Sequence, residues 1–115
     1  SCVMIHSNSI YFVTTPIDMR FGMGRLTTFL QVNFPNKCFS GALFIFTNRQ
    51  RSMFKLISID SHGIWLCQRK LHQGNFPKFQ TEQSELILTQ EQFNWLCKGF
   101  DFSKIEGLNL ANFKH

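Results

Sequence analysis

The side chains with the clearest chemical potential in this sequence are cations gathered in its middle third. They are Arg49, Arg51, Lys55, Arg69 and Lys70. A guanidinium group binds phosphate oxygens as a two-pronged fork, and the amide of the adjacent Asn48 can add hydrogen bonds. The cluster predicts a surface for phosphate backbones or for acidic protein partners. Hairpin tips are also polar without any binding role, so the pattern alone leaves that interpretation open.

Charge is unevenly distributed along the 115 residues, whose formal net charge is +5. Residues 41–80 hold six basic residues against Asp60 and so carry a surplus equal to the whole net charge. Residues 81–115 hold five acidic residues against three lysines. The positive field is therefore expected in the first two thirds of the chain, and the C-terminal third is acidic.

A second candidate site lies between Pro16 and Arg20. Asp18 is expected to cap the helix that follows by accepting hydrogen bonds from its first turn. Arg20 would then project from that turn toward a phosphate or an acidic partner. Alternatively, Asp18 and Arg20 form a local ion pair, which contributes little to stability.

Residues for catalysis or metal binding are scarce. The chain has seven acidic residues, and five of them lie in its C-terminal third, so a cluster of carboxylates for divalent metal is not expected. Cys67 and His72 are the nearest pair of zinc-ligand types, and no further ligand stands at a suitable spacing. The sequence predicts a protein that is not an enzyme, with no metal and no cofactor. A small metal-dependent nuclease using Asp18 or Asp60 is the least favoured alternative.

The four cysteines include no C-x-x-C pair, and three of them stand beside apolar residues, as buried thiols do. No apolar run approaches the roughly 20 residues that span a bilayer. These features predict a reduced, cytoplasmic protein.

Hydrophobic patterning predicts the elements that position these side chains. Residues 10–14, 42–47, 53–59 and 64–69 are expected to be strands, and residues 85–88 are a candidate for a further short strand. The short turns at 48–51 and 60–63 demand antiparallel neighbours, which brings Arg69 and Lys70 to the same sheet edge as Arg49 and Arg51. The aromatic residues at alternating positions are expected in the core. They are Phe44, Phe46, Phe54, Trp65 and Trp95.

Two helices are expected. The first follows Asp18, and its apolar positions are Met23, Leu26, Phe29 and Leu30. The second begins at a capping box formed by Thr89 and Gln92, with Leu88 and Phe93 as a hydrophobic staple, and Gly99 is well placed to end it. The predicted fold is α+β. It is an antiparallel sheet of about four strands with two helices packed on one face, in a single domain over 1–115 whose core spans about 9–102 and whose tail, 103–115, is irregular.

Ordered motifs over about residues 9–102 resemble one known family, the TnpB accessory proteins of IS66-type insertion sequences. The motifs are Ile10-Tyr11-Phe12-Val13, Pro16-x-Asp18-Met19-Arg20-x-Gly22, Phe39-Ser40-Gly41-x-Leu43-Phe44-x-Phe46-x-Asn48-Arg49-x-Arg51, Lys55-Leu56, Asp60-x-x-Gly63-x-Trp65-Leu66, Arg69-Lys70-Leu71, Gly74-x-Phe76, Leu88-Thr89-x-Glu91-Gln92 and Gly99-x-Asp101. The family usually has Lys where this chain has Phe21. These proteins are distinct from the RNA-guided nucleases that share the TnpB name.

The resemblance implies a non-catalytic helper of DNA transposition, encoded beside a large transposase and another small protein, which would be its partners. We expect DNA, or the transposase–DNA complex, to be bound through the basic sheet edge. The expected contacts are Arg20, Asn48, Arg49, Arg51, Lys55, Arg69 and Lys70. The alternative is a protein adaptor whose basic edge meets an acidic surface of the transposase without touching DNA.

Overall fold

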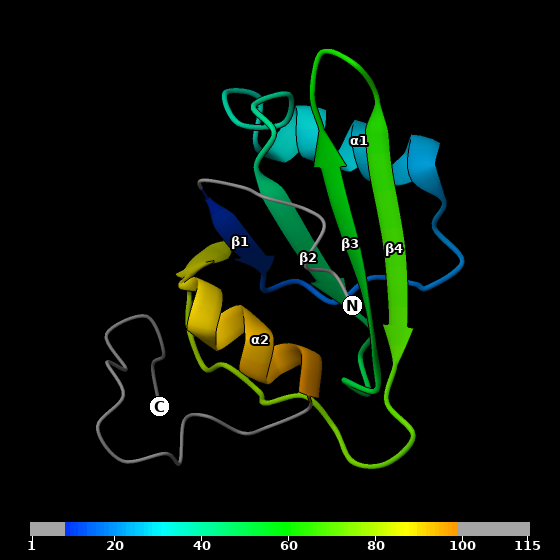
Figure 1. Cartoon of the computed structure of the whole chain (residues 1–115), viewed down its shortest axis with the longest axis vertical. Helices are drawn as coiled ribbons and strands as arrows, with labels where there is room; N and C mark the ends of the chain where they lie inside the picture. Colours follow the sequence, from blue (N-terminus) through cyan, green and yellow to red (C-terminus); the bar gives the residue numbers. More distant parts are fainter. Residues whose placement is uncertain (1–8, 99–115) are drawn as a thin grey trace.

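The computed structural model describes residues 9–98, which form a five-stranded sheet with one helix on each face (Figure 1). The elements in chain order are β1 (Ile10–Val13), α1 (Met23–Asn33), β2 (Leu43–Thr47), β3 (Met53–Ile59), β4 (Ile64–Lys70), β5 (Glu85–Leu88) and α2 (Gln90–Lys98). The order of strands across the sheet is β4-β3-β2-β1-β5, so β4 and β5 are the outermost strands.

The sheet is mixed, because β1 and β2 are parallel while every other pair is antiparallel. The α+β class is confirmed, but the purely antiparallel sheet of about four strands was wrong. The physical reason lies in the connections. Residues 14–42 join β1 to β2 and include α1, which is long enough to cross over and start a parallel strand. The short turns that join β2 to β3 and β3 to β4 permit only antiparallel neighbours.

The two helices cover opposite faces of the sheet, which corrects the expectation that both pack on one face. Leu26 and Leu30 of α1 pack against Phe44 and the other β2 side chains of that face. Phe93 and Leu96 of α2 belong to the second core cluster, with the β2 side chains that point the other way. All five residues of β2 are buried, so its continuous apolar run is that of a strand covered on both sides.

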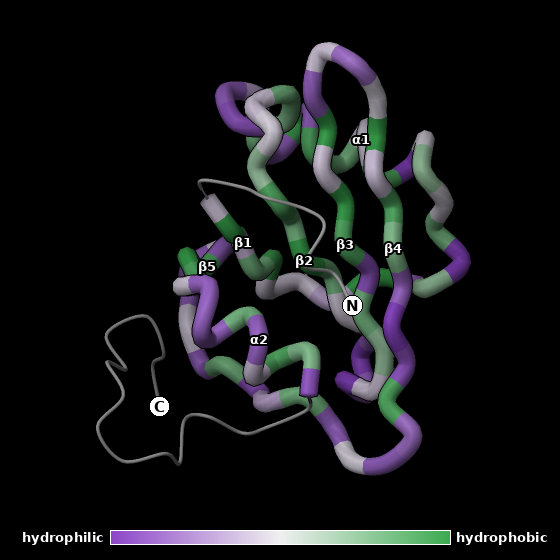
Figure 2. The backbone as a smooth tube through the Cα atoms, in the orientation of Figure 1, coloured by the Kyte–Doolittle hydropathy of each residue, from purple (hydrophilic) through white to green (hydrophobic). Residues whose placement is uncertain are grey.

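The loop that joins β4 to β5 contributes to the core on the α2 side. Phe76 is fully buried and its ring centroid lies 5.0 Å from that of Phe54. The ring of Phe79 meets the ring of Phe12 edge-on, with centroids 4.8 Å apart. Hydrophobic residues accordingly line the middle of the sheet in Figure 2, while the turns and the last half of β4 are hydrophilic.

The aromatic residues expected in the core divide into two groups. Phe44, Phe46 and Phe54 are fully buried, as predicted. Trp65 is 55% exposed, because β4 is an outermost strand and α2 does not extend over its first residues. Trp95 is half-buried against the core cluster on the α2 side.

The start of α2 has the predicted capping box. The backbone N–H of Gln92 donates to the Thr89 hydroxyl at 3.0 Å, and the backbone N–H of Thr89 donates to the Gln92 side-chain oxygen at 2.9 Å. Leu88 and Phe93 are both buried in the same cluster, as a hydrophobic staple requires. Gly99 and the tail 103–115 lie outside the described residues.

The start of α1 differs from the expectation. Its N-cap is Gly22, which provides no side-chain hydrogen bond, so the prediction that Asp18 caps this helix was wrong. Leu26 and Leu30 are buried, whereas Met23 is 43% exposed. The first helix is therefore held by packing rather than by its cap.

We expect Thr89→Ala to lower the free energy of unfolding by about 1 kcal/mol, because one N–H at the start of α2 loses its acceptor. Thr89→Asp keeps an acceptor oxygen at the same position and should stay close to the wild type. Urea unfolding followed by circular dichroism measures both. Equal losses for the two variants would contradict a capping role for Thr89.

Candidate nucleic-acid interface

Three chain segments meet at one end of the sheet. Because β1 and β2 are parallel, the residues after each strand emerge at the same end, where β3 also begins and β4 finishes (Figure 1). The segments are 14–22, 48–52 and 71–84. The backbone N–H of Ile17 donates to the Thr47 carbonyl at 2.9 Å, and that of Leu71 donates to the Ser52 carbonyl at 2.9 Å. The carboxyl ends of parallel strands are a common place for ligand sites.

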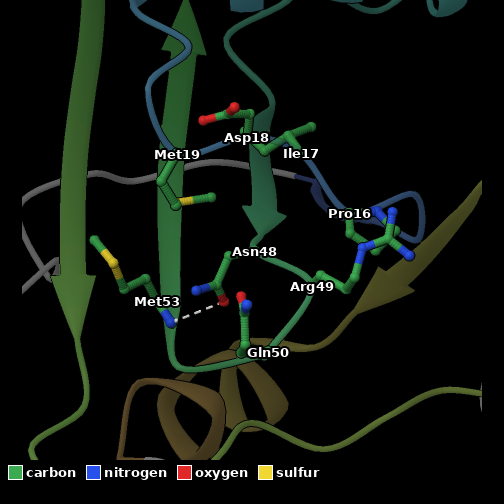
Figure 3. A pocket seen from close by; sticks show the side chains of 8 residues that line it. All are labelled: Pro16, Ile17, Asp18, Met19, Asn48, Arg49, Gln50 and Met53. Carbon is green, nitrogen blue, oxygen red and sulfur yellow. Dashed lines mark hydrogen bonds between the residues drawn. The ribbon is translucent and has the colours of Figure 1, made fainter.

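Asn48 builds the turn between β2 and β3. Its side-chain oxygen accepts hydrogen bonds from the backbone N–H groups of Ser52 and Met53, at 2.9 and 3.2 Å. Its side-chain nitrogen donates to the Ser52 hydroxyl at 3.0 Å. Figure 3 shows the Asn48 amide directed back into the turn. Asn48 therefore positions its neighbours, and its amide is already engaged.

Arg51 ties the turn to the loop after β4. Its φ of 60° lies in the left-handed region, which is uncommon for a residue other than glycine. One guanidinium nitrogen donates to the Phe76 carbonyl at 3.0 Å, and the Phe76 backbone N–H donates to the Arg51 carbonyl at 2.6 Å. The backbone and the side chain of Arg51 thus both hold the segment that buries Phe76.

Lys55 does not lie at the exposed edge expected from the sequence. It is 8% exposed, and its ammonium group donates to the Phe21 carbonyl at 2.6 Å. The alternation along β3 places Lys55 on the same face as Ile57 and Ile59, which α1 and its preceding loop cover. Lys55 is therefore an anchor for that loop.

Arg69 and Lys70 are exposed at the end of β4, where the register aligns them with Phe54 and Met53 at the start of β3. The guanidinium of Arg69 also donates through Nε to the Cys97 carbonyl in the last turn of α2. A cation at a helix C-terminus interacts favourably with the free carbonyls there. Arg69 thereby joins α2 to the edge strand.

Arg20 is paired with Asp18. The Arg20 guanidinium donates to both carboxylate oxygens of Asp18, at distances down to 2.6 Å, and the Arg20 backbone N–H donates to the same carboxylate at 2.8 Å. These hydrogen bonds lower the pKa of Asp18 from 3.8 to about 2. The bonds from the guanidinium have the largest effect, and the bond from the backbone N–H has the next largest. The ion pair is exposed to solvent, and it offsets the charge that Arg20 would offer to a phosphate.

Two hollows open at this end, and both are lined by Pro16 and Arg49. The first has a volume of about 450 Å³ and also includes Asp18, Asn48 and Met53 in its lining (Figure 3). The second has a volume of about 320 Å³ and lies between the ends of β1 and β2 and the segment 77–79. Arg49 is exposed where the two hollows adjoin.

Apart from Arg20, which is paired with Asp18, the exposed cations of this region are Arg49, Arg69, Lys70 and Lys78, which we call the cationic end. Within residues 9–98 the two ion pairs are Arg20–Asp18 and Lys37–Glu85, so no carboxylate pairs with the cationic end there. The sequence pattern did not single out Lys78, because it stands in a loop without periodicity. The feature of the sequence that could have indicated Lys78 is the pair of aromatic residues on either side of it, Phe76 and Phe79, which pack the loop onto the core.

Among residues 9–98, no group of three or more His, Cys, Asp or Glu side chains is placed to hold a metal ion. Of the cysteines in these residues, Cys38 is buried, and Cys67 and Cys97 are half-buried. None of the helices in that part of the chain is long and apolar enough to cross a membrane.

Comparison with known proteins reveals one family. Residues 8–107 match the family model described as IS66 Orf2 like protein. A curated protein of Sinorhizobium fredii, described as uncharacterized protein y4hO, is 28% identical over 93 residues, which cover 81% of each chain. No solved structure matches the chain.

We expect Arg51→Ala to lower the free energy of unfolding by about 1–3 kcal/mol, because the Phe76 carbonyl loses a charged donor. Arg49→Ala removes an equal charge from the same turn and should change stability by less than about 0.5 kcal/mol. Urea denaturation of the two variants measures the difference. Equal destabilisation would show that the Arg51–Phe76 contact is not a structural clamp.

The Asp18–Arg20 pair predicts a local pH dependence. Because the pKa of Asp18 is lowered to about 2, the pair contributes its stability above pH 4 and loses it as pH falls toward 2. Arg20→Gln should raise the pKa of Asp18 toward 3.8, as measured by NMR titration of the carboxyl carbon. Asp60 is the internal control, since backbone hydrogen bonds from His62 and Gly63 lower its pKa and do not involve Arg20. An unchanged Asp18 midpoint in the variant would argue against the pair.

Proposed function

The chain belongs to the IS66 Orf2-like family of insertion-sequence accessory proteins, and we propose that it serves transposition by binding DNA, alone or together with the transposase, through the cationic end. Membership of the family supports a role in transposition. The distribution of charge supports DNA as the molecule that is contacted.

The observation that carries the proposal is the convergence of exposed cations from separate segments. Arg49 comes from the turn after β2, Lys70 from the end of β4, and Lys78 from the loop that follows it. All three lie at the end of the sheet where segments 14–22, 48–52 and 71–84 meet, and neither of the two described ion pairs involves them. A set of cations at one end attracts a polyanion more strongly than the same charges dispersed over the surface.

The expected contact is with the phosphate backbone rather than with base edges. Lys side chains act as mobile point charges, and exposed Arg side chains bind phosphate as forks. Both neutralise phosphates whatever the base sequence, and the released counterions make the affinity depend steeply on salt. Binding at the cationic end is therefore proposed to be independent of DNA sequence.

We predict that the wild-type protein binds a fluorescent duplex at low salt and that a double variant, Arg49→Ala with Lys70→Ala, binds more weakly. If each side chain contacts one phosphate, the slope of log K against log salt falls by about 0.9 for each side chain removed. Arg25→Ala is the control, because it removes one charge from α1, away from the turn after β2 (Figure 1). Fluorescence anisotropy at several salt concentrations gives the slopes.

An unchanged slope in the double variant, or the absence of duplex binding at low salt, would overturn the DNA contact. A nuclease-resistant complex with purified transposase that is lost in the same double variant would then support the adaptor alternative. That second measurement keeps the two interpretations apart.

A further inference from the structure

The second hollow at the cationic end has a lining suited to a concentrated anion. Its three charged residues are all cations, contributed by two different segments. Arg49 and Arg51 come from the turn after β2, and Lys78 comes from the loop after β4. No carboxylate of residues 9–98 belongs to the second hollow, whereas the first hollow includes Asp18. The second hollow is therefore the better anion site of the two.

The walls of this hollow are held by specific contacts. Thr14 donates through its backbone N–H to the Ser84 carbonyl at 3.1 Å, and through its hydroxyl to the Gln83 carbonyl at 2.7 Å. These bonds fix the far part of the loop to the end of β1. The Arg51–Phe76 contacts fix the near part, and the edge-on contact of Phe79 with Phe12 closes the space between them. A site held in this way loses little entropy when a ligand binds.

Arg51 is already oriented before any ligand arrives. Its bond to the Phe76 carbonyl occupies one of the five N–H donors of a guanidinium group. Lys78 and Arg49 are exposed and can move toward the same space. One fixed and two mobile cations together match the double negative charge of a phosphate monoester better than the single charge of a phosphodiester or a carboxylate.

We propose that this hollow binds a phosphate monoester, and specifically the terminal phosphate of a DNA strand. The lining also has an apolar part, Phe12, Pro16, Pro77 and Phe79, against which we expect the adjoining sugar or base to pack. The choice of a DNA end as the ligand rests on the proposed function. The binding of a phosphate monoester rests on the hollow alone, so the two can fail separately.

The test compares oligonucleotides of one sequence that carry a 5′-phosphate, a 3′-phosphate or hydroxyl groups at both ends, with inorganic phosphate as a separate probe. We expect one phosphorylated form to bind about tenfold more tightly than the hydroxyl form, the equivalent of one charge-assisted contact. Lys78→Gln should abolish this preference. Lys70→Gln removes the same charge at the same end but outside the hollow, so it should weaken all forms alike and keep the preference.

Each outcome decides one of the two proposals. Equal binding of all three oligonucleotides, or a preference that survives Lys78→Gln, overturns the monoester site and leaves the DNA contact standing. Shifts of the Thr14 and Lys78 amide resonances with inorganic phosphate, without any oligonucleotide binding, support the site and overturn the DNA contact. The absence of both responses overturns both. The melting temperature of Lys78→Gln, an exposed loop variant, verifies that it is folded.

Discussion

The parallel pairing of β1 with β2 is the constraint on which the rest of the structure depends. It requires a crossover, and the crossover places α1 on one face while the loop after β4 and α2 cover the other. It also directs the residues that follow β1 and β2 toward the same end, so that Ile17 bonds to Thr47 and both hollows form beside Pro16. An antiparallel arrangement of these two strands would send the same loops to opposite ends.

Features governed by local chemistry were predictable from the sequence. The capping box of Thr89 and Gln92, the tight turn at 60–63 and the β2–β3–β4 meander depend on residues close together in the chain. The parallel pair was not predicted, because its partners are separated by 29 residues and no local pattern reports which strand lies beside β1. The continuous apolar run of β2 indicates a strand that is buried on both faces. Such a strand requires elements packed on both sides of the sheet, which is the arrangement that the prediction lacked.

The sequence predicted which cations lie near one another better than it predicted what each of them does. Short turns were enough to bring Arg49 and Lys70 to one end, but a sequence does not show which cations become structural. Lys55 and Arg51 each bond to a carbonyl of a residue more than twenty positions away, Phe21 and Phe76. Such pairings arise only when the chain is folded, which is also why Lys78 emerged from the structure and not from the pattern.

The open edge of β4 has a consequence for self-association. Within residues 9–98 it is an outermost strand, whose backbone N–H and C=O groups on one side meet no strand of that part of the chain, and Trp65 is exposed near its start. An uncovered edge of seven residues is a template for pairing with another chain, and like charges are one means by which proteins discourage it. Arg69 and Lys70 place two positive charges at the end of this edge, so the cations proposed to meet a polyanion would also disfavour the joining of sheets from neighbouring molecules.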